Sequence, residues 1–114
     1  MDNCLFCKIA RGEIPSKIVY HDECTVVFAD VNPKAPVHLL AIPRAHYAAI
    51  HEVPASEMGM IQRLFAAVST VVASENLVDE GYRLVVNFGE NSGQAVPHIH
   101  VHILGGRAMQ WPPG

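Results

Sequence analysis

Apolar and polar residues follow two different periods along this chain. Short runs of β-branched, aromatic and alternating apolar residues predict β-strands. Proline and glycine residues between these runs predict loops, because both interrupt regular strands. The predicted strands are residues 18–21, 25–30, 38–42, 82–87 and 97–104.

A longer segment, residues 56–74, has apolar residues every three or four positions and predicts an amphipathic helix. Pro54 and Glu57 are favourable residues for its first turn. Residues 5–10 can form a short N-terminal helix that ends near Gly12. The apolar stripe of the long helix consists of Met60, Ile61, Leu64, Phe65, Val68, Val71 and Val72.

Several strands with hairpin-length connections and one main helix predict an α+β fold with a five-stranded antiparallel sheet. A parallel sheet would need a helical crossover between most of its strands. The length of 114 residues predicts a single domain spanning residues 1–114. Because so short a chain buries a modest share of its surface, dimerisation would add useful burial.

The overall charge narrows the range of partners. The formal net charge is −3 with neutral histidines, and no basic stripe is visible, so we expect no long nucleic acid as a partner. No apolar run approaches the roughly 20 residues of a membrane span, and the N-terminus lacks a secretory signal. Three cysteines argue against a full disulfide framework. We therefore expect a cytoplasmic protein with no membrane partner.

The segment 98–104, His-Ile-His-Val-His-Ile-Leu, carries the strongest chemical signal. On a strand, alternation would place His98, His100 and His102 on one face and the apolar residues on the other. Three imidazoles are costly to bury without partners, and imidazole changes charge near neutral pH. The pattern favours a catalytic site. Two alternatives remain. One is a zinc site, because histidines on alternate strand positions can ligate zinc. The other is a purely structural face of histidines.

This segment resembles the signature of the histidine triad superfamily. The C-terminal residues 105–114, together with residues 12–15 and 30–38, resemble its histidine triad nucleotide-binding protein branch. The resemblance extends from about Cys4 to Gly114. It implies a nucleoside phosphoramidase or nucleoside monophosphate hydrolase acting on purine nucleotides, and a homodimer whose two sheets join into one continuous sheet.

The resemblance also implies the catalytic roles. His100 would attack the α-phosphorus and form a nucleotidyl-histidine intermediate, which splits one difficult displacement into two easier ones. A backbone carbonyl near His98 would accept a hydrogen bond from the other ring nitrogen and fix the tautomer of His100. His102 would bind a phosphate oxygen or assist the leaving group, and His38 would support the triad. No cofactor is expected for catalysis.

Five residues correspond, by the same resemblance, to the nucleoside part of the site. Phe6, Ile9, Phe28 and Val31 would form the apolar cleft that holds the purine. Asp30 would accept hydrogen bonds from the ribose hydroxyls. Taken without the resemblance, Asp30 is equally well explained as a turn residue before Asn-Pro, and the two phenylalanines as ordinary core aromatics.

A second group corresponds to the phosphate end of the site. Asn87 and Gln94 would donate amide hydrogen bonds to the phosphate, and Gly93 would allow close approach of the backbone. Ala95 stands where many relatives have a serine hydroxyl, so protonation of the leaving group must rest on a histidine, water or the backbone. Trp111 would lie near the partner's site in the dimer and help to select substrates, or else anchor the tail.

The N-terminal Cys-x-x-Cys pair, Cys4 and Cys7, is half of a zinc site. Some bacterial-type triad proteins that resemble this chain here complete a closed structural zinc site with histidines at the positions of His46 and His98. The alternative is two reduced cysteines without a metal, packed as small apolar side chains.

We expect an enzyme that cleaves adenosine or guanosine phosphoramidates, including aminoacyl-adenylate-type substrates. Two alternatives remain. One is a dinucleoside polyphosphate hydrolase, against which the tail 105–114 argues. The other is a nucleotide-binding or scaffolding protein without catalytic activity, against which the intact histidines argue.

Overall fold

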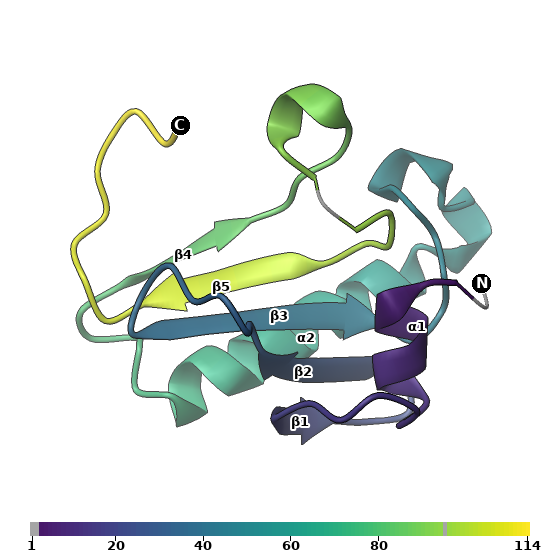
Figure 1. Cartoon of the computed structure of the whole chain (residues 1–114), viewed down its shortest axis with the longest axis horizontal. Coiled ribbons are helices and arrows are strands. Elements are labelled where there is room, and N and C mark those ends of the chain that lie inside the picture. The colour runs from purple at the N-terminus through teal and green to yellow at the C-terminus, as the bar shows by residue number, and fades with distance from the viewer. Residues whose placement is uncertain (1–2, 95) are drawn as a thin grey trace.

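The molecule is built on a five-stranded antiparallel sheet with the strand order β1-β2-β3-β5-β4 (Figure 1). The structure is a computed structural model that describes residues 3–94 and 96–114. Short 3₁₀ turns occupy Ile50–Glu52, Ala55–Glu57 and Glu90–Ser92. The main elements are α1 (Leu5–Ala10), β1 (Ile18–His21), β2 (Thr25–Ala29), β3 (Val37–Pro43), α2 (Gly59–Ser74), β4 (Tyr82–Val85) and β5 (Val101–Gly105).

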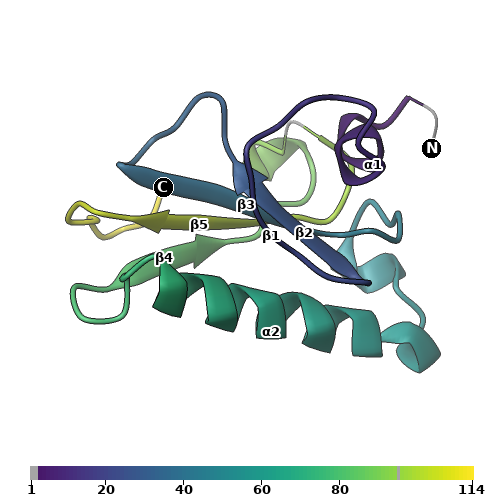
Figure 2. The ribbon, with the colours of Figure 1, turned by 90° about the horizontal axis from the view of Figure 1, so that it is seen from below.

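The two faces of the sheet differ. Helix α2 covers one face, and α1 lies against the other (Figure 2). Under α2, the core combines β-branched residues of the strands with the apolar stripe of the helix, including Leu64, Val68 and Ile103. The opposite face carries a smaller apolar cluster of Phe6, Ile9, Val26, Phe28, Leu40 and Ile42. The second cluster leaves part of its face open, and the candidate site is formed there.

The register of the two central strands brings two histidines together. His38 of β3 lies opposite Leu104 of β5, and Leu40 lies opposite His102. His38 and His102 are therefore diagonal neighbours on the same face, a spacing within reach of long or aromatic side chains.

The predicted α+β class, the five antiparallel strands and the two helices are confirmed. The long helix begins later than predicted, at Gly59, because residues 55–58 form a tighter turn with hydrogen bonds from Glu57 N–H to Pro54 O and from Met58 N–H to Ala55 O. Its buried stripe also differs from the prediction. Phe65 is 39% exposed, and the small Ala67 is buried in its place.

The last strand was predicted to begin at residue 97, and this is wrong: β5 begins at Val101. Continuing the β3–β5 register would place Pro43 opposite Ile99, and proline has no N–H for the ladder. Ile99 N–H instead donates to Tyr47 O at 2.8 Å. His98 and His100 therefore lie just before the strand, on irregular backbone.

The fourth strand is also shorter than predicted. It ends at Val85, and the chain then leaves the sheet toward the 3₁₀ turn. Among the residues that the structure describes, no helix is long and apolar enough to cross a membrane.

Candidate functional site

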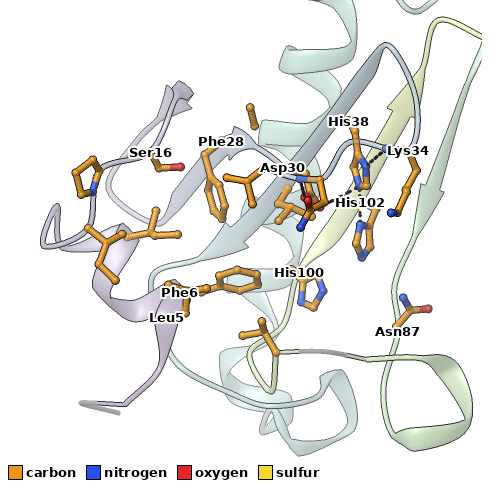
Figure 3. Close-up of a pocket in the computed structure, with 18 of the residues that line it drawn as sticks. Leu5, Phe6, Ser16, Phe28, Asp30, Lys34, His38, Asn87, His100 and His102 are labelled. Carbon is orange, nitrogen blue, oxygen red and sulfur yellow. Dashed lines mark hydrogen bonds and ion pairs between the residues drawn. The ribbon is translucent and has the colours of Figure 1, made fainter.

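A cavity of about 610 Å³ opens on the sheet face opposite α2 (Figure 3). Its apolar end is formed by α1 and β2, where the rings of Phe6 and Phe28 meet edge to face with centroids 5.5 Å apart. Leu5 and Val31 line the same cavity and are 44% and 88% exposed. Exposed apolar side chains around a cavity are suited to an apolar or aromatic ligand.

His100 lies in the cavity wall and is only 5% exposed. Its Nδ1 is 2.7 Å from the carbonyl oxygen of His98. Because a carbonyl can only accept, Nδ1 carries the hydrogen, and the lone pair of the neutral ring is on Nε2. The ring of Phe6, at a centroid distance of 5.1 Å, packs against the imidazole. His100 thus has a fixed tautomer and an available nucleophilic nitrogen.

The polar end of the cavity contains a hydrogen-bonded chain of two histidines. The backbone N–H of Lys34 donates to His38 Nδ1 at 2.9 Å, so the hydrogen of His38 is on Nε2. That nitrogen lies 2.9 Å from His102 Nδ1 and 3.4 Å from a carboxylate oxygen of Asp30. With Nδ1 accepting, the hydrogen of His102 is on Nε2, where it can be donated to a ligand.

Burial favours the neutral form of both of these rings. Burial is the main cause that lowers the pKa of His102 to about 4, and neighbouring His100 and His38 lower it further, against an opposing effect of Asp30. The pKa of His38 is also lowered, mainly by burial, with Asp30 opposing and Lys34 adding to the decrease. A histidine in this environment serves as a hydrogen-bond donor more readily than as an acid.

A second cluster lies behind His100 and contains Cys4, Cys7, His46 and His98. His98 is fully buried, and its Nε2–H donates to Pro43 O at 2.8 Å, which leaves the Nδ1 lone pair facing the cluster. Burial is the main cause that lowers the pKa of His98 to about 4, so at neutral pH the ring is neutral, with its one hydrogen on Nε2. Burial, and then the neighbouring Cys4, raise the pKa of the Cys7 thiol.

The distances within this cluster fit a tetrahedral metal ion. Those from Cys4 Sγ to His98 Nδ1 and from Cys7 Sγ to His46 Nδ1 are both 3.3 Å. The two Nδ1 atoms are 3.1 Å apart, and Cys7 Sγ is 3.6 Å from His98 Nδ1. Tetrahedral zinc, with bonds of about 2.0 Å to nitrogen and about 2.3 Å to sulfur, separates its ligand atoms by roughly 3.3 Å (two nitrogens) to roughly 3.8 Å (two sulfurs). The donor types and their spacing suit zinc.

The three histidines of the motif therefore take separate places. Within the described part of the chain, His98 belongs to the cysteine cluster, His102 groups with His38 and Asp30, and His100 belongs to neither cluster. The ligand atoms of Asp30, His38 and His102 also lie close enough together to hold a metal ion. His38 Nε2 carries a hydrogen, however, and so has no lone pair for a metal. This group is therefore a hydrogen-bonded chain.

Most of the residues predicted for nucleotide binding line the cavity: Phe6, Ile9, Phe28, Asp30, Val31, Asn87 and Gly93. Gln94 does not; its amide bonds to Ala48 O at 3.3 Å and to Gly89 N–H at 3.2 Å and so holds the loop. Trp111 is 81% exposed and lies next to the Arg83 guanidinium, 5.8 Å from the ring centroid. Ala95 lies outside the described residues.

Sequence reasoning missed several cavity residues. The most consequential is Lys34, since it brings a positive charge into a largely apolar cavity. Its signal is a lysine in the short loop between Asp30 and His38, a loop that the sequence indicates as a break between strands and as part of the family resemblance, without a role for its lysine. The full set of missed residues is Leu5, Ile14, Pro15, Ser16, Ala29, Asn32, Lys34, Leu40 and Val96.

Comparison with known proteins agrees with this geometry. The family model for the HIT domain matches residues 11–109. The chain belongs to the HIT domain family. A crystal structure of a HIT family hydrolase from Legionella pneumophila superposes with a TM-score of 0.94 at 46% identity, covering 98% of this chain and 100% of that one. The superfamily expected from the histidine segment is thus confirmed, and it places the chain among hydrolases and nucleotide-binding proteins.

Two curated proteins are also similar to this chain over most of its length. An uncharacterized HIT-like protein of Synechococcus elongatus is 45% identical over 113 residues, covering 99% of this chain and 98% of that protein. A 14 kDa zinc-binding protein of Zea mays is 45% identical over 111 residues, covering 96% and 87%.

Acidification is expected to destabilise the HIT fold through His102. In the unfolded chain the pKa of His102 is near its ordinary value of 6.5, whereas in the folded protein it is about 4. Between these values the unfolded state binds more protons, so the free energy of unfolding falls as the pH decreases through this window. Urea unfolding at several pH values will measure how steeply the free energy of unfolding depends on pH.

The matched variants are His102→Gln, which removes the titrating ring, and His21→Gln, which removes an exposed one. His102→Gln should reduce the pH dependence, with the remainder due to His98, whose folded pKa is also about 4, and His21→Gln should leave it unchanged. An unaltered slope in His102→Gln would contradict the assignment.

Proposed function

We propose that this protein is a purine nucleoside phosphoramidase of the histidine triad nucleotide-binding branch. It hydrolyses amides or esters of purine nucleoside 5′-monophosphates through a covalent intermediate on His100. The observation that carries the proposal is the hydrogen bond from His100 Nδ1–H to His98 O, which leaves the Nε2 lone pair available in the wall of the cavity.

The two ends of the cavity give the substrate its orientation. The purine occupies the apolar end between Phe6 and Phe28, where aromatic and aliphatic side chains surround it. Asp30 holds the ribose: one of its oxygens accepts from Asn32 N–H at 2.8 Å, and its remaining lone pairs accept from the ribose hydroxyls. This arrangement brings the α-phosphorus to His100.

The reaction then proceeds in two displacements. The Nε2 lone pair of His100 forms a bond to phosphorus as the bond to the leaving amine breaks, and the amine takes a proton from solvent. Water then attacks phosphorus, the bond to Nε2 breaks, and the nucleoside monophosphate leaves with a proton released to solvent. Throughout, His100 keeps its Nδ1–H on the His98 carbonyl, which stabilises the positive charge on the ring of the intermediate.

His102 acts in this scheme by donating a hydrogen bond. Its Nε2–H points to a phosphate oxygen, and His38 keeps that hydrogen in place by occupying Nδ1. Charge that develops on the phosphate oxygens is stabilised by such a preorganised donor. Of the two roles expected for His102, phosphate binding is favoured, because a ring with a pKa of about 4 is neutral at neutral pH.

We further propose that Cys4, Cys7, His46 and His98 hold a structural zinc ion. Four protein ligands leave no open position, so the metal contributes stability and not reactivity. The ion would fix the backbone of His98, whose carbonyl orients the nucleophile. None of the three cysteines forms a disulfide in the described part of the chain, which also supports a reducing compartment, the cytoplasm.

A homodimer formed along β4 is also proposed. β4 is an edge strand of the sheet, and an exposed strand edge is a ready surface for pairing with another chain. Tyr82, Val86 and Phe88, on or just beyond this strand, are 45%, 42% and 50% exposed. Pairing there would extend the sheet and bring the tail with Trp111 toward the second copy.

The catalytic proposal predicts that His100→Ala loses phosphoramidase activity. Hydrolysis of a fluorogenic adenosine 5′-phosphoramidate should fall by about 10³-fold or more, because the nucleophile is absent. His51→Ala, an exposed histidine outside the cavity, is the matched control and should retain activity. Diadenosine tetraphosphate, run in parallel, should be the poorer substrate.

A wild-type protein that cleaves neither compound would refute the enzyme proposal and favour a nucleotide-binding role. Retained activity in His100→Ala would refute the assignment of the nucleophile.

The zinc proposal predicts one equivalent of zinc in the purified protein, measured by atomic emission. Cys7→Ala should abolish binding and lower the thermal midpoint, because metal binding contributes directly to folding free energy. Cys24→Ala, which changes a cysteine outside the cluster, should keep the metal. Wild-type protein purified without zinc, or zinc retained in Cys7→Ala, would contradict the assignment.

The dimer proposal predicts a sedimentation mass twice that of one chain. Val86→Lys places a charge beside the edge strand and should shift the equilibrium toward monomer. Val78→Lys, at a 61% exposed position between α2 and β4, should not. A monomeric wild-type protein at micromolar concentration would refute the interface.

A further inference from the structure

Lys34 differs in charge from every other residue that lines the cavity. Among the lining residues that the structure describes, Lys34 is the one lysine or arginine, and Asp30 is the one residue with a carboxylate. Figure 3 shows Lys34 beside His38 and His102, on the side of His100 away from Phe6 and Phe28. Its position thus distinguishes one end of the cavity from the other electrostatically.

The backbone of Lys34 is held on both sides. Its N–H donates to His38 Nδ1 at 2.9 Å, and its carbonyl accepts from Arg107 Nε at 2.9 Å. Lys34 contributes only its main-chain N–H and carbonyl to these bonds, so they do not depend on its side chain. A substitution at this position therefore changes the charge at the cavity without removing the contact that fixes the tautomer of His38.

The ammonium group of Lys34 is available for a ligand. In residues 3–94 and 96–114, the ion pairs formed within the chain join Arg11 to Glu13 and His38 to Asp30, and neither involves Lys34. The nearest carboxylate of the cavity, Asp30, is already engaged by Asn32 N–H and by His38. A lysine beside a cavity that forms no ion pair with another described side chain is a suitable partner for an anionic ligand.

The proposed reaction determines which part of the substrate lies near Lys34. With the purine between Phe6 and Phe28 and phosphorus at His100, the leaving group extends toward the polar end. Asn87 also lines that end and can offer a neutral amide. Lys34 supplies the charge there.

We propose that Lys34 selects substrates whose leaving group bears a carboxylate close to the scissile bond, such as nucleoside 5′-phosphoramidates formed on the amino group of an α-amino acid. This inference rests on the proposed function and adds a substrate class to it. Lys34 is a specificity-determining residue in this scheme: it attracts the leaving group and takes no part in bond breaking.

The test compares two adenosine 5′-phosphoramidates that differ in one charge, those of alanine and of alaninamide. In the wild type, kcat/KM should be about tenfold higher for the alanine compound, the size expected of one charge-assisted contact at a partly exposed site. Lys34→Gln should remove this preference by raising KM for the alanine compound alone. Lys34→Arg should restore it, and added salt should weaken it in the wild type.

Lys17→Gln is the matched control, because it removes the same charge from an exposed lysine that does not line the cavity. It should leave both substrates unaffected. An equal loss for both substrates in Lys34→Gln would place the lysine on the α-phosphate and overturn the proposal, as would the absence of any loss.

A binding measurement separates this proposal from the proposed function. In a His100→Ala background, calorimetry should give a lower Kd for the alanine compound than for the alaninamide compound, and Lys34→Gln should equalise the two. If the wild type cleaves neither compound while this difference in Kd persists, the proposed reaction fails and the selectivity of Lys34 stands. Equal Kd values in the His100→Ala protein overturn the role of Lys34 whatever the catalytic result.

Discussion

The hydrogen bond from His100 Nδ1–H to the carbonyl of His98 is the constraint on which the chemistry of this fold depends. It determines which nitrogen carries the lone pair, and it does so with a backbone atom whose acceptor role never changes with pH. The carbonyl is available because the backbone here has left the sheet ladder. An ordinary strand at this position would have used that oxygen for pairing, and the proline that ends β3 explains why the ladder stops there.

The same stretch of backbone joins two sites that would otherwise be unrelated. The side chain of His98 belongs to the cysteine cluster, whereas its main-chain oxygen belongs to the cavity. Stabilising the cluster therefore limits the motion of the atom that orients His100. In metal sites, neighbouring groups hold the metal ligands in place; here the cysteine–histidine cluster would hold in place the carbonyl that orients the proposed nucleophile.

Much of this architecture could be predicted from the sequence because it follows from periodicity. The core stripe of α2 and the strands near residues 18–43 are local patterns, and the structure matches them closely. The details that sequence reasoning missed depend on contacts between distant segments. The departure of His98 from the predicted strand depends on Pro43, and the place of Lys34 in the cavity depends on a proline-containing loop whose Lys34 N–H bonds to His38 of β3. A strand-break signal predicts that a loop exists but not which side chain it directs into a site.

The bond from Arg107 Nε to Lys34 O has a consequence beyond local stability. It connects the C-terminal tail to the loop at the polar end of the cavity, and Arg83 holds the tail again through Gln110 O. His100 and the carbonyl that orients it lie outside this connection. Changes in the tail can therefore reshape the polar end of the cavity while the hydrogen bond that fixes the tautomer of His100 stays in place.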